Sequence, residues 1–208
     1  MSSIVRALSP VPSLPVETLR SSVRVNANNQ DNEANLKELA SDLGSFLGRS
    51  TLTDVIVYAE GQAIHAHKAL LAARSPVLQA LFERISKENR PNVILINDLS
   101  CEVVQEMISF LYSGKVNIVS LELLTAAERY SIKGLKRICT KNLVKKLTMS
   151  TCVDTLIASH VNKCPDLETE AVKYTAKNWK YVRREKNCAN LYNWPLLLVR
   201  LIDSLAKV

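Results

Sequence analysis

Histidines and cysteines are the residues of this chain that do chemistry most readily, and their spacing decides which sites they could form. His65 and His67 lie two apart in a stretch with strand character, where both side chains share a face. A metal site needs further ligands, and no cysteine or carboxylate pair with ligand spacing lies near them. His160 and Cys164 lie four apart on an expected helix and form an equally incomplete set. We therefore expect structural roles for both pairs and no metal site.

A second candidate site combines Asp54, His67 and Ser75. Asp54 and His67 are expected at neighbouring ends of a β-hairpin, where a hydrogen bond would fix the strand to the next helix. A catalytic dyad would need a nucleophile beside it. Ser75 precedes Pro76, a pattern that predicts a helix N-cap followed by proline at the first helical position. These residues are predicted to be structural.

The chain lacks the sequence motifs of the common enzyme classes. It contains no Gly-x-Ser-x-Gly elbow, no His-Glu-x-x-His, no Walker loop and no dinucleotide fingerprint. We therefore expect no catalytic residue, no cofactor and no enzyme activity.

A stripe of cations recurs every four residues at Lys133, Arg137, Lys141 and Lys145. Such a stripe can meet phosphates, but the opposite face of this expected helix is apolar, which is typical of a core helix with a solvated outer face. Aromatic stacking residues and zinc-finger spacings are missing here. The solvated face is the favoured interpretation and no nucleic-acid partner is expected. The formal charge of +7 leaves an acidic partner open.

The elements that position these residues begin after a tail. Residues 1–31 are rich in turn formers and are expected to be disordered. A helix over 32–47 then carries an apolar stripe. The stripe predicts either a helix docked on its own core or one that packs on a second copy of the chain. Its members are Leu36, Leu39, Leu43, Phe46 and Leu47.

Strands are expected at 53–59 and 62–67, and the apolar run 93–96 predicts a strand that is buried on both faces. Expected helices cover 68–74, 76–84, 101–113, 120–131, 133–146, 150–162, 166–182 and 194–206. Because strands end early and helices continue to the C-terminus, the pattern favours an α+β fold with a helical extension.

The compartment is inferred from cysteines and hydropathy. The five cysteines are odd in number and widely spaced, which favours free thiols in a reducing cytosol or nucleus. No apolar run approaches the roughly 20 residues of a membrane span. The N-terminus also lacks the organisation of a secretory signal. We expect the nucleus or the cytoplasm and no membrane partner.

Several segments together resemble the BTB/POZ domain, most closely that of the speckle-type POZ group. The similar segments are Asp54, His67–Ala69, Leu71–Pro76, Phe82, Ile96–Asp98, Phe110–Gly114, Leu123–Tyr130 and Leu135–Cys139. The resemblance covers roughly residues 36–208. It implies a BTB/POZ domain over 32–147, with a small three-stranded sheet and surrounding helices. It also implies a three-box or BACK-like helical extension over 148–208.

The resemblance implies an adaptor function. BTB domains commonly dimerise, and the positions that match the speckle-type dimer contact are Leu39, Leu43, Phe46 and Leu70. Members of that group grip the N-terminal region of cullin-3 in a RING ubiquitin ligase. They raise the effective concentration of a substrate for ubiquitination and proteasomal degradation without catalysing a step themselves.

The chain departs from the family pattern at the cullin-binding loop. The family has a hydrophobic residue two positions before a glutamate, whereas this chain has Ser86 before Glu88, with Ile85 one place early. These residues and Tyr112 are expected near the cullin groove. A second self-association surface is expected on the last helix, at Leu198, Leu201, Ile202 and Leu205, although the family usually has an aromatic residue at the position of Ile202.

Two functions follow as hypotheses. The first is a homodimeric substrate adaptor of a cullin-3 ubiquitin ligase, whose substrate the sequence does not identify. The alternative is a dimerisation module without ligase activity, which pairs with longer MATH-BTB relatives and regulates them. Ser86 and the expectation that no MATH domain precedes the BTB domain favour this alternative.

Overall fold

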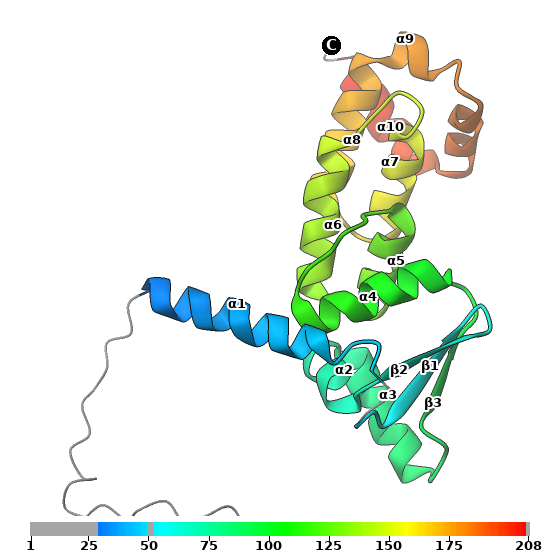
Figure 1. Ribbon diagram of the computed structural model, residues 1–208. Coiled ribbons are helices and arrows are strands. Elements are labelled where there is room, and N and C mark those ends of the chain that lie inside the picture. Colours follow the sequence, from blue (N-terminus) through cyan, green and yellow to red (C-terminus); the bar gives the residue numbers. More distant parts are fainter. Residues whose placement is uncertain (1–28, 50–51, 207–208) are drawn as a thin grey trace, which may run out of the picture. The chain divides into compact units, whose positions relative to one another are not determined.

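The computed structural model describes residues 29–49 and 52–206 of the 208-residue chain (Figure 1). The chain divides into two compact units, Met1–Lys37 and Glu38–Val208. Within the first unit, the described residues 29–37 are helical. Most of the tail expected over 1–31 lies outside the described residues, but its last three residues begin the first helix.

All described strands and the helices that follow them belong to the second unit. The elements are, in chain order, α1 (Asn29–Ser45), β1 (Val55–Ala59), β2 (Gln62–Ala66), α2 (Lys68–Arg74), α3 (Pro76–Lys87), β3 (Val93–Ile96), α4 (Cys101–Ser113), α5 (Leu121–Arg129), α6 (Lys133–Lys145), α7 (Cys152–Val161), α8 (Pro165–Lys177), α9 (Trp179–Val182), the 3-10 helix η2 (Lys186–Asn193) and α10 (Pro195–Leu205). The order confirms the predicted α+β fold followed by an all-helical C-terminal region.

The three strands form one mixed sheet in the order β2-β1-β3. β1 and β2 are an antiparallel hairpin, and Glu60 and Gly61 at its turn both have positive φ, at 48° and 77°. Positive φ at both central residues is the geometry of a tight type I′ turn, which glycine adopts without steric cost. β3 pairs with β1 in parallel, which needs a crossover connection, and α2 and α3 supply it.

The prediction that β3 is buried on both faces is wrong. Ile94 and Ile96 point into the core, whereas Val93 is 38% exposed and Leu95 is 67% exposed. The physical reason is that β3 is an edge strand of a sheet that packs on the core with one face only (Figure 1). An apolar run of four residues does not distinguish this position from a central strand.

Two hydrophobic cores stabilise the second unit. The first lies between the sheet and α2–α6, and Met107 and Leu124 are among its fully buried side chains. The second lies within α7–α10 and includes Leu156 and Leu197. Leu167 of α8 packs in the first core although it lies after residue 148. The two cores therefore do not separate at 147/148, and the domain boundary expected there stays a prediction.

The helix termini follow local sequence signals. Ser100 accepts a hydrogen bond from Val103 N, and Gly114 ends α4 in the left-handed conformation with φ 71°. The single helix predicted over 166–182 is divided at Asn178, whose side-chain amide bonds to Tyr174 O at 2.9 Å. The 3-10 helix η2 was not predicted. Among the helices of residues 29–49 and 52–206, none has the length and apolarity that crossing a bilayer requires.

Candidate partner-binding surfaces

The first candidate surface combines the C-terminal part of α1 with α2. Leu39 is 53% exposed, while Leu43, Phe46 and Leu70 are half-buried. The Phe46 ring packs edge-on against the His67 ring, with their centroids 5.8 Å apart. Phe46 and Leu70 also pack against the first core. Phe46 and Leu70 are thus anchored in the core, and the four side chains together leave apolar area for a partner.

The hairpin holds the start of α2 in place. Asp54 Oδ1 accepts a hydrogen bond from Lys68 N at 2.7 Å, and Asp54 N donates to Ala66 O. His67 N donates to the Tyr112 hydroxyl at 2.8 Å, and His67 Nδ1 lies 2.7 Å from the same oxygen. Asp54 and His67 therefore contact different partners. Both contacts fix α2, and with it Leu70, relative to the sheet and to α4.

The Tyr112 hydroxyl is a buried polar group. Burial raises its pKa above 10.0, the hydrogen bond from His67 N opposes this shift, and the negative charge of Asp54 adds to it. The hydroxyl is therefore protonated at neutral pH. Its two contacts with His67 give the phenol an internal partner, as a buried polar group requires.

Ser75 links α3 to α5. Its Oγ accepts from Leu78 N at 3.2 Å as the N-cap of α3 and donates to Tyr130 O at 2.7 Å. The side chain is fully buried. Because the hydroxyl proton goes to a backbone carbonyl and not to a general base, this geometry does not activate a nucleophile.

The residues expected near a cullin groove are divided between surface and core. Ser86 and Glu88 are exposed at the end of α3, where Glu88 pairs with Arg90 at 2.8 Å. Ile85 is buried beneath them at 7% exposure, and Tyr112 is buried at 2%. Tyr112 therefore offers its hydroxyl to His67 within the chain. The exposed part of this set is the Ser86–Glu88 segment.

The helix α10 has a different outward face from the one expected. The residues predicted for a second self-association surface were Leu198, Leu201, Ile202 and Leu205. Leu201 is buried at 1%, and Leu198 and Leu205 are half-buried against the second core. Ile202 is 62% exposed, together with Leu196 at 69% and Val199 at 56%. Because α10 has apolar residues on both faces, its sequence did not indicate which face points outward.

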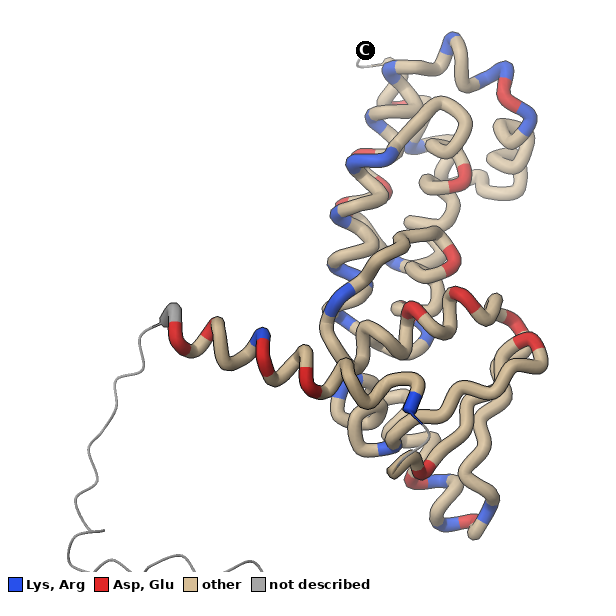
Figure 2. Tube along the Cα trace, in the orientation of Figure 1, with Lys and Arg blue, Asp and Glu red and all other residues tan. Residues whose placement is uncertain are grey.

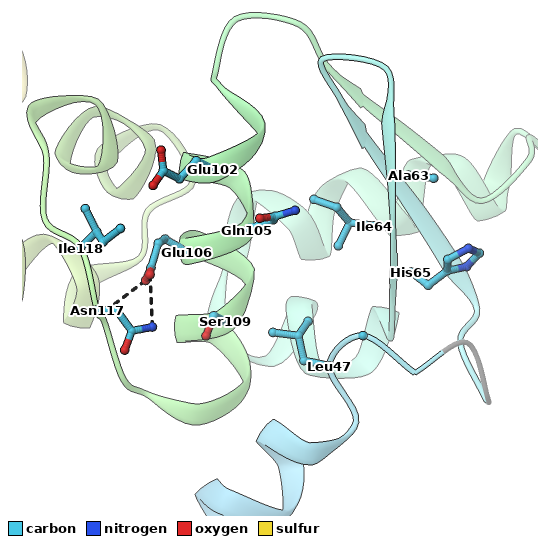
Figure 3. A pocket seen from close by; sticks show the side chains of 11 residues that line it. Leu47, Ala63, Ile64, His65, Glu102, Gln105, Glu106, Ser109, Asn117 and Ile118 are labelled. Atoms are coloured by element: carbon cyan, nitrogen blue, oxygen red, sulfur yellow. Dashed lines mark hydrogen bonds between the residues drawn. The ribbon is translucent and has the colours of Figure 1, made fainter.

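A groove of about 520 Å³ lies between β2 and α4 (Figure 3). Leu47 and Ile64 point into it, whereas the ring of His65 points away. On its other side, Glu106 accepts hydrogen bonds from Asn117 N and Nδ2, each at 3.2 Å. Glu106 is thus held by Asn117 on this side of the groove. This groove was not predicted, because residues from four separate segments form it.

An ion cluster joins three helices of the C-terminal region. Glu168 of α8 is buried, with His160 Nδ1 3.1 Å from its Oε2, and it also pairs with Arg200 of α10. The Trp194 ring packs edge-on against His160. Sequence spacing paired His160 with Cys164, which is a buried N-cap of α8. Within residues 29–49 and 52–206, no group of three or more metal-ligating side chains gathers.

A sequence profile of the BTB/POZ domain matches residues 43–147, which extend from the end of α1 through α6. The mouse protein "TD and POZ domain-containing protein 3" is 38% identical over 175 residues. That match covers 81% of this chain and 48% of the mouse protein, so the chain spans about half the length of this relative.

Among solved structures, the chain is similar to the BTB domain of zebrafish PATZ1. The identity is 23%, the TM-score is 0.45, and the match covers 60% of this chain and all of that domain. BTB/POZ domains are protein–protein interaction modules that generally dimerise and bind partner proteins. The profile match extends over half of the chain. The protein therefore belongs to the BTB/POZ domain family.

Proposed function

We propose that the protein is a homodimeric substrate adaptor of a cullin-3 ubiquitin ligase and catalyses no step itself. The observation that carries the proposal is the apolar surface of α1 and α2. Leu39 exposes about half of its side chain to solvent, beside the partly exposed Leu43, Phe46 and Leu70. A contiguous apolar surface on a folded chain marks an interaction site. In a two-fold dimer the same four residues of both copies would meet.

The cullin contact is assigned to the end of α3. Ser86 and Glu88 are exposed there, and the buried Ile85 supports the turn from beneath, where its carbonyl accepts a hydrogen bond from Arg90 N. Tyr112 lies in the core of the same domain and helps to hold its shape. A dimer would present two such contacts, and each would raise the local concentration of a bound substrate near the ligase.

The test is calorimetry and co-elution of the purified protein with the N-terminal region of cullin-3. We expect heat and co-elution with the wild type and weaker binding of Glu88→Lys. The matched control is Glu83→Lys, which changes an exposed carboxylate within α3, whereas Glu88 is the C-cap of that helix. Absence of both heat and co-elution for the wild type at micromolar concentration rejects ligase membership. Equal weakening by both substitutions rejects the assigned contact.

A second function is supported by Ser86. Its polar side chain is exposed where the family's cullin-binding loop has a hydrophobic residue. The second candidate is therefore a pairing module that forms mixed dimers with longer MATH-BTB relatives and reduces their output. Co-purification of differently tagged copies of this chain and the mouse relative measures the pairing directly. Ser86→Met is expected to create cullin affinity under this hypothesis, and an unchanged affinity counts against it.

The proposed place of action is the nucleus or the cytoplasm. All five cysteines are free thiols, and four of them are buried. A reducing compartment suits such thiols. The last helix supplies a further proposed contact between dimers, centred on the exposed Ile202. Loss of higher oligomers in Ile202→Asp, with the dimer retained, is the result expected in light scattering.

A further inference from the structure

A groove of about 610 Å³ lies between α6 and the N-terminal half of α8. One wall carries the cations of α6, which Figure 2 marks in blue along that helix. Five cations line the groove: Lys133, Lys136, Arg137, Lys141 and Lys145. The stripe is exposed to solvent, as the sequence indicated, and it also forms one wall of a concave surface.

Among the described residues, ion pairs engage one of these five cations. Lys136 is engaged, because its Nζ contacts Glu128 Oε2 at 2.6 Å and the carbonyl oxygens of Asn162 and Lys163. The other four form no ion pair with any acid in the part of the chain that the structure describes. Like charges four residues apart on a helix repel one another and destabilise it. An anionic partner would relieve this repulsion.

The groove also has an apolar component. Val144 is half-buried and packs against the first core, and Cys164 is buried at 4% exposure. The lining residues include no aromatic side chain on which a base can stack. Two carboxylates, Asp166 and Glu170, stand on the α8 side. They would repel a continuous phosphate backbone, whereas a peptide can place neutral or basic side chains opposite them.

We propose that the α6–α8 groove docks an acidic amphipathic segment of a partner protein. The acidic side chains of this segment pair with Lys133, Arg137, Lys141 and Lys145. Its apolar side chains pack on Val144 and the apolar surface beside it, which form the floor of the groove. This recognition mode is a helix laid in a groove, strengthened by complementary charge. For an adaptor, such a segment is a means of recruiting a substrate.

The experiment uses a fluorescent probe peptide of about 15 residues, with leucines at helical spacing and glutamates elsewhere. Its control peptide has glutamine at every glutamate position. Fluorescence anisotropy is measured with the whole protein and no cullin, so the outcome is separate from the proposed ligase role. We expect the acidic peptide to bind and the glutamine peptide to bind more weakly.

Three variants of the protein, one of them a control, locate the contact. Arg137→Gln with Lys141→Gln should weaken binding roughly 2- to 30-fold, because each exposed ion pair changes an equilibrium constant about 1.5- to 5-fold. The matched control, Lys180→Gln with Arg184→Gln, removes two exposed cations outside the groove and should leave binding unchanged. Val144→Thr keeps the shape of the floor and makes it polar, so it should also weaken binding.

Three results overturn the proposal. The first is no anisotropy change at roughly 100 μM protein, far above a micromolar Kd. The second is equal weakening by the groove and control pairs, which indicates general charge attraction. The third is tighter binding of a single-stranded oligonucleotide than of the peptide, with a steep salt dependence and no effect of Val144→Thr. That result assigns the groove to nucleic acid.

Discussion

The substitution Leu39→Ser should separate self-association from folding. Leu39 is 53% exposed on α1, so the folded protomer makes limited use of its side chain. A substitution at such a surface position changes the free energy of unfolding by roughly 0.5 kcal/mol or less. We therefore expect a protein with near-normal thermal stability that dimerises weakly.

The size of the effect follows from the exposed area. Complete burial of a leucine side chain contributes about 1.5–3 kcal/mol, so covering the exposed half of Leu39 contributes about 0.8–1.6 kcal/mol. A two-fold dimer uses the contact twice, which gives about 1.6–3.2 kcal/mol. The dimer Kd should accordingly rise roughly 15- to 200-fold in Leu39→Ser.

Sedimentation velocity over a dilution series measures this Kd. The matched control is Leu95→Ser, because Leu95 is 67% exposed but lies on the edge strand β3, outside the proposed interface. An unchanged Kd in Leu39→Ser, or an equal rise in both variants, contradicts the assignment. A wild-type chain that stays a folded protomer at the highest concentration refutes the dimer itself.

Three further predictions concern the core. Tyr112→Phe should lower the free energy of unfolding in urea by about 1–3 kcal/mol, because the His67 N–H and ring nitrogen lose their buried partner. Burial raises the pKa of the Cys139 thiol from 9.0 to about 12. The folded state therefore holds a proton that the unfolded chain releases, and stability should fall as the pH rises above 9.0. Thermal melts of Cys139→Ala should show a flatter alkaline decline. Glu168→Ala should cost about 1.5–3 kcal/mol, since its histidine and arginine partners lose a buried acceptor, while the exposed Glu170→Ala should change little.

Much of the fold could be predicted because its signals are local. The positions of Ser75 before Pro76 and of Gly114 after α4 mark helix boundaries through hydrogen bonds that span three or four residues. The hairpin turn at Glu60-Gly61 likewise depends on the backbone freedom of adjacent residues. The division of the helix at Asn178 was missed, because a competing side-chain bond is a weaker signal than apolar periodicity.

The candidate surfaces were harder to predict than the elements that carry them. The family resemblance placed Tyr112 near a partner, and the apolar stripe of the last helix did the same for Leu201, but the structure places both in cores. The sequence identified the cations of α6 without revealing that α8 faces them across a groove. The Glu168 cluster joins residues of three helices, so the spacing of residues within one helix could not predict it.

The amino-acid sequence by itself determined the order and type of most elements, many of the caps and turns that bound them, and the membership of the BTB/POZ family. Those properties depend on backbone preferences and on neighbours within about one helical turn. Only the tertiary structure decided which apolar residues stay exposed, which polar groups are satisfied internally, and where grooves form. Those properties depend on packing between segments far apart in the chain, and a side chain becomes core or surface according to what the distant segment covers.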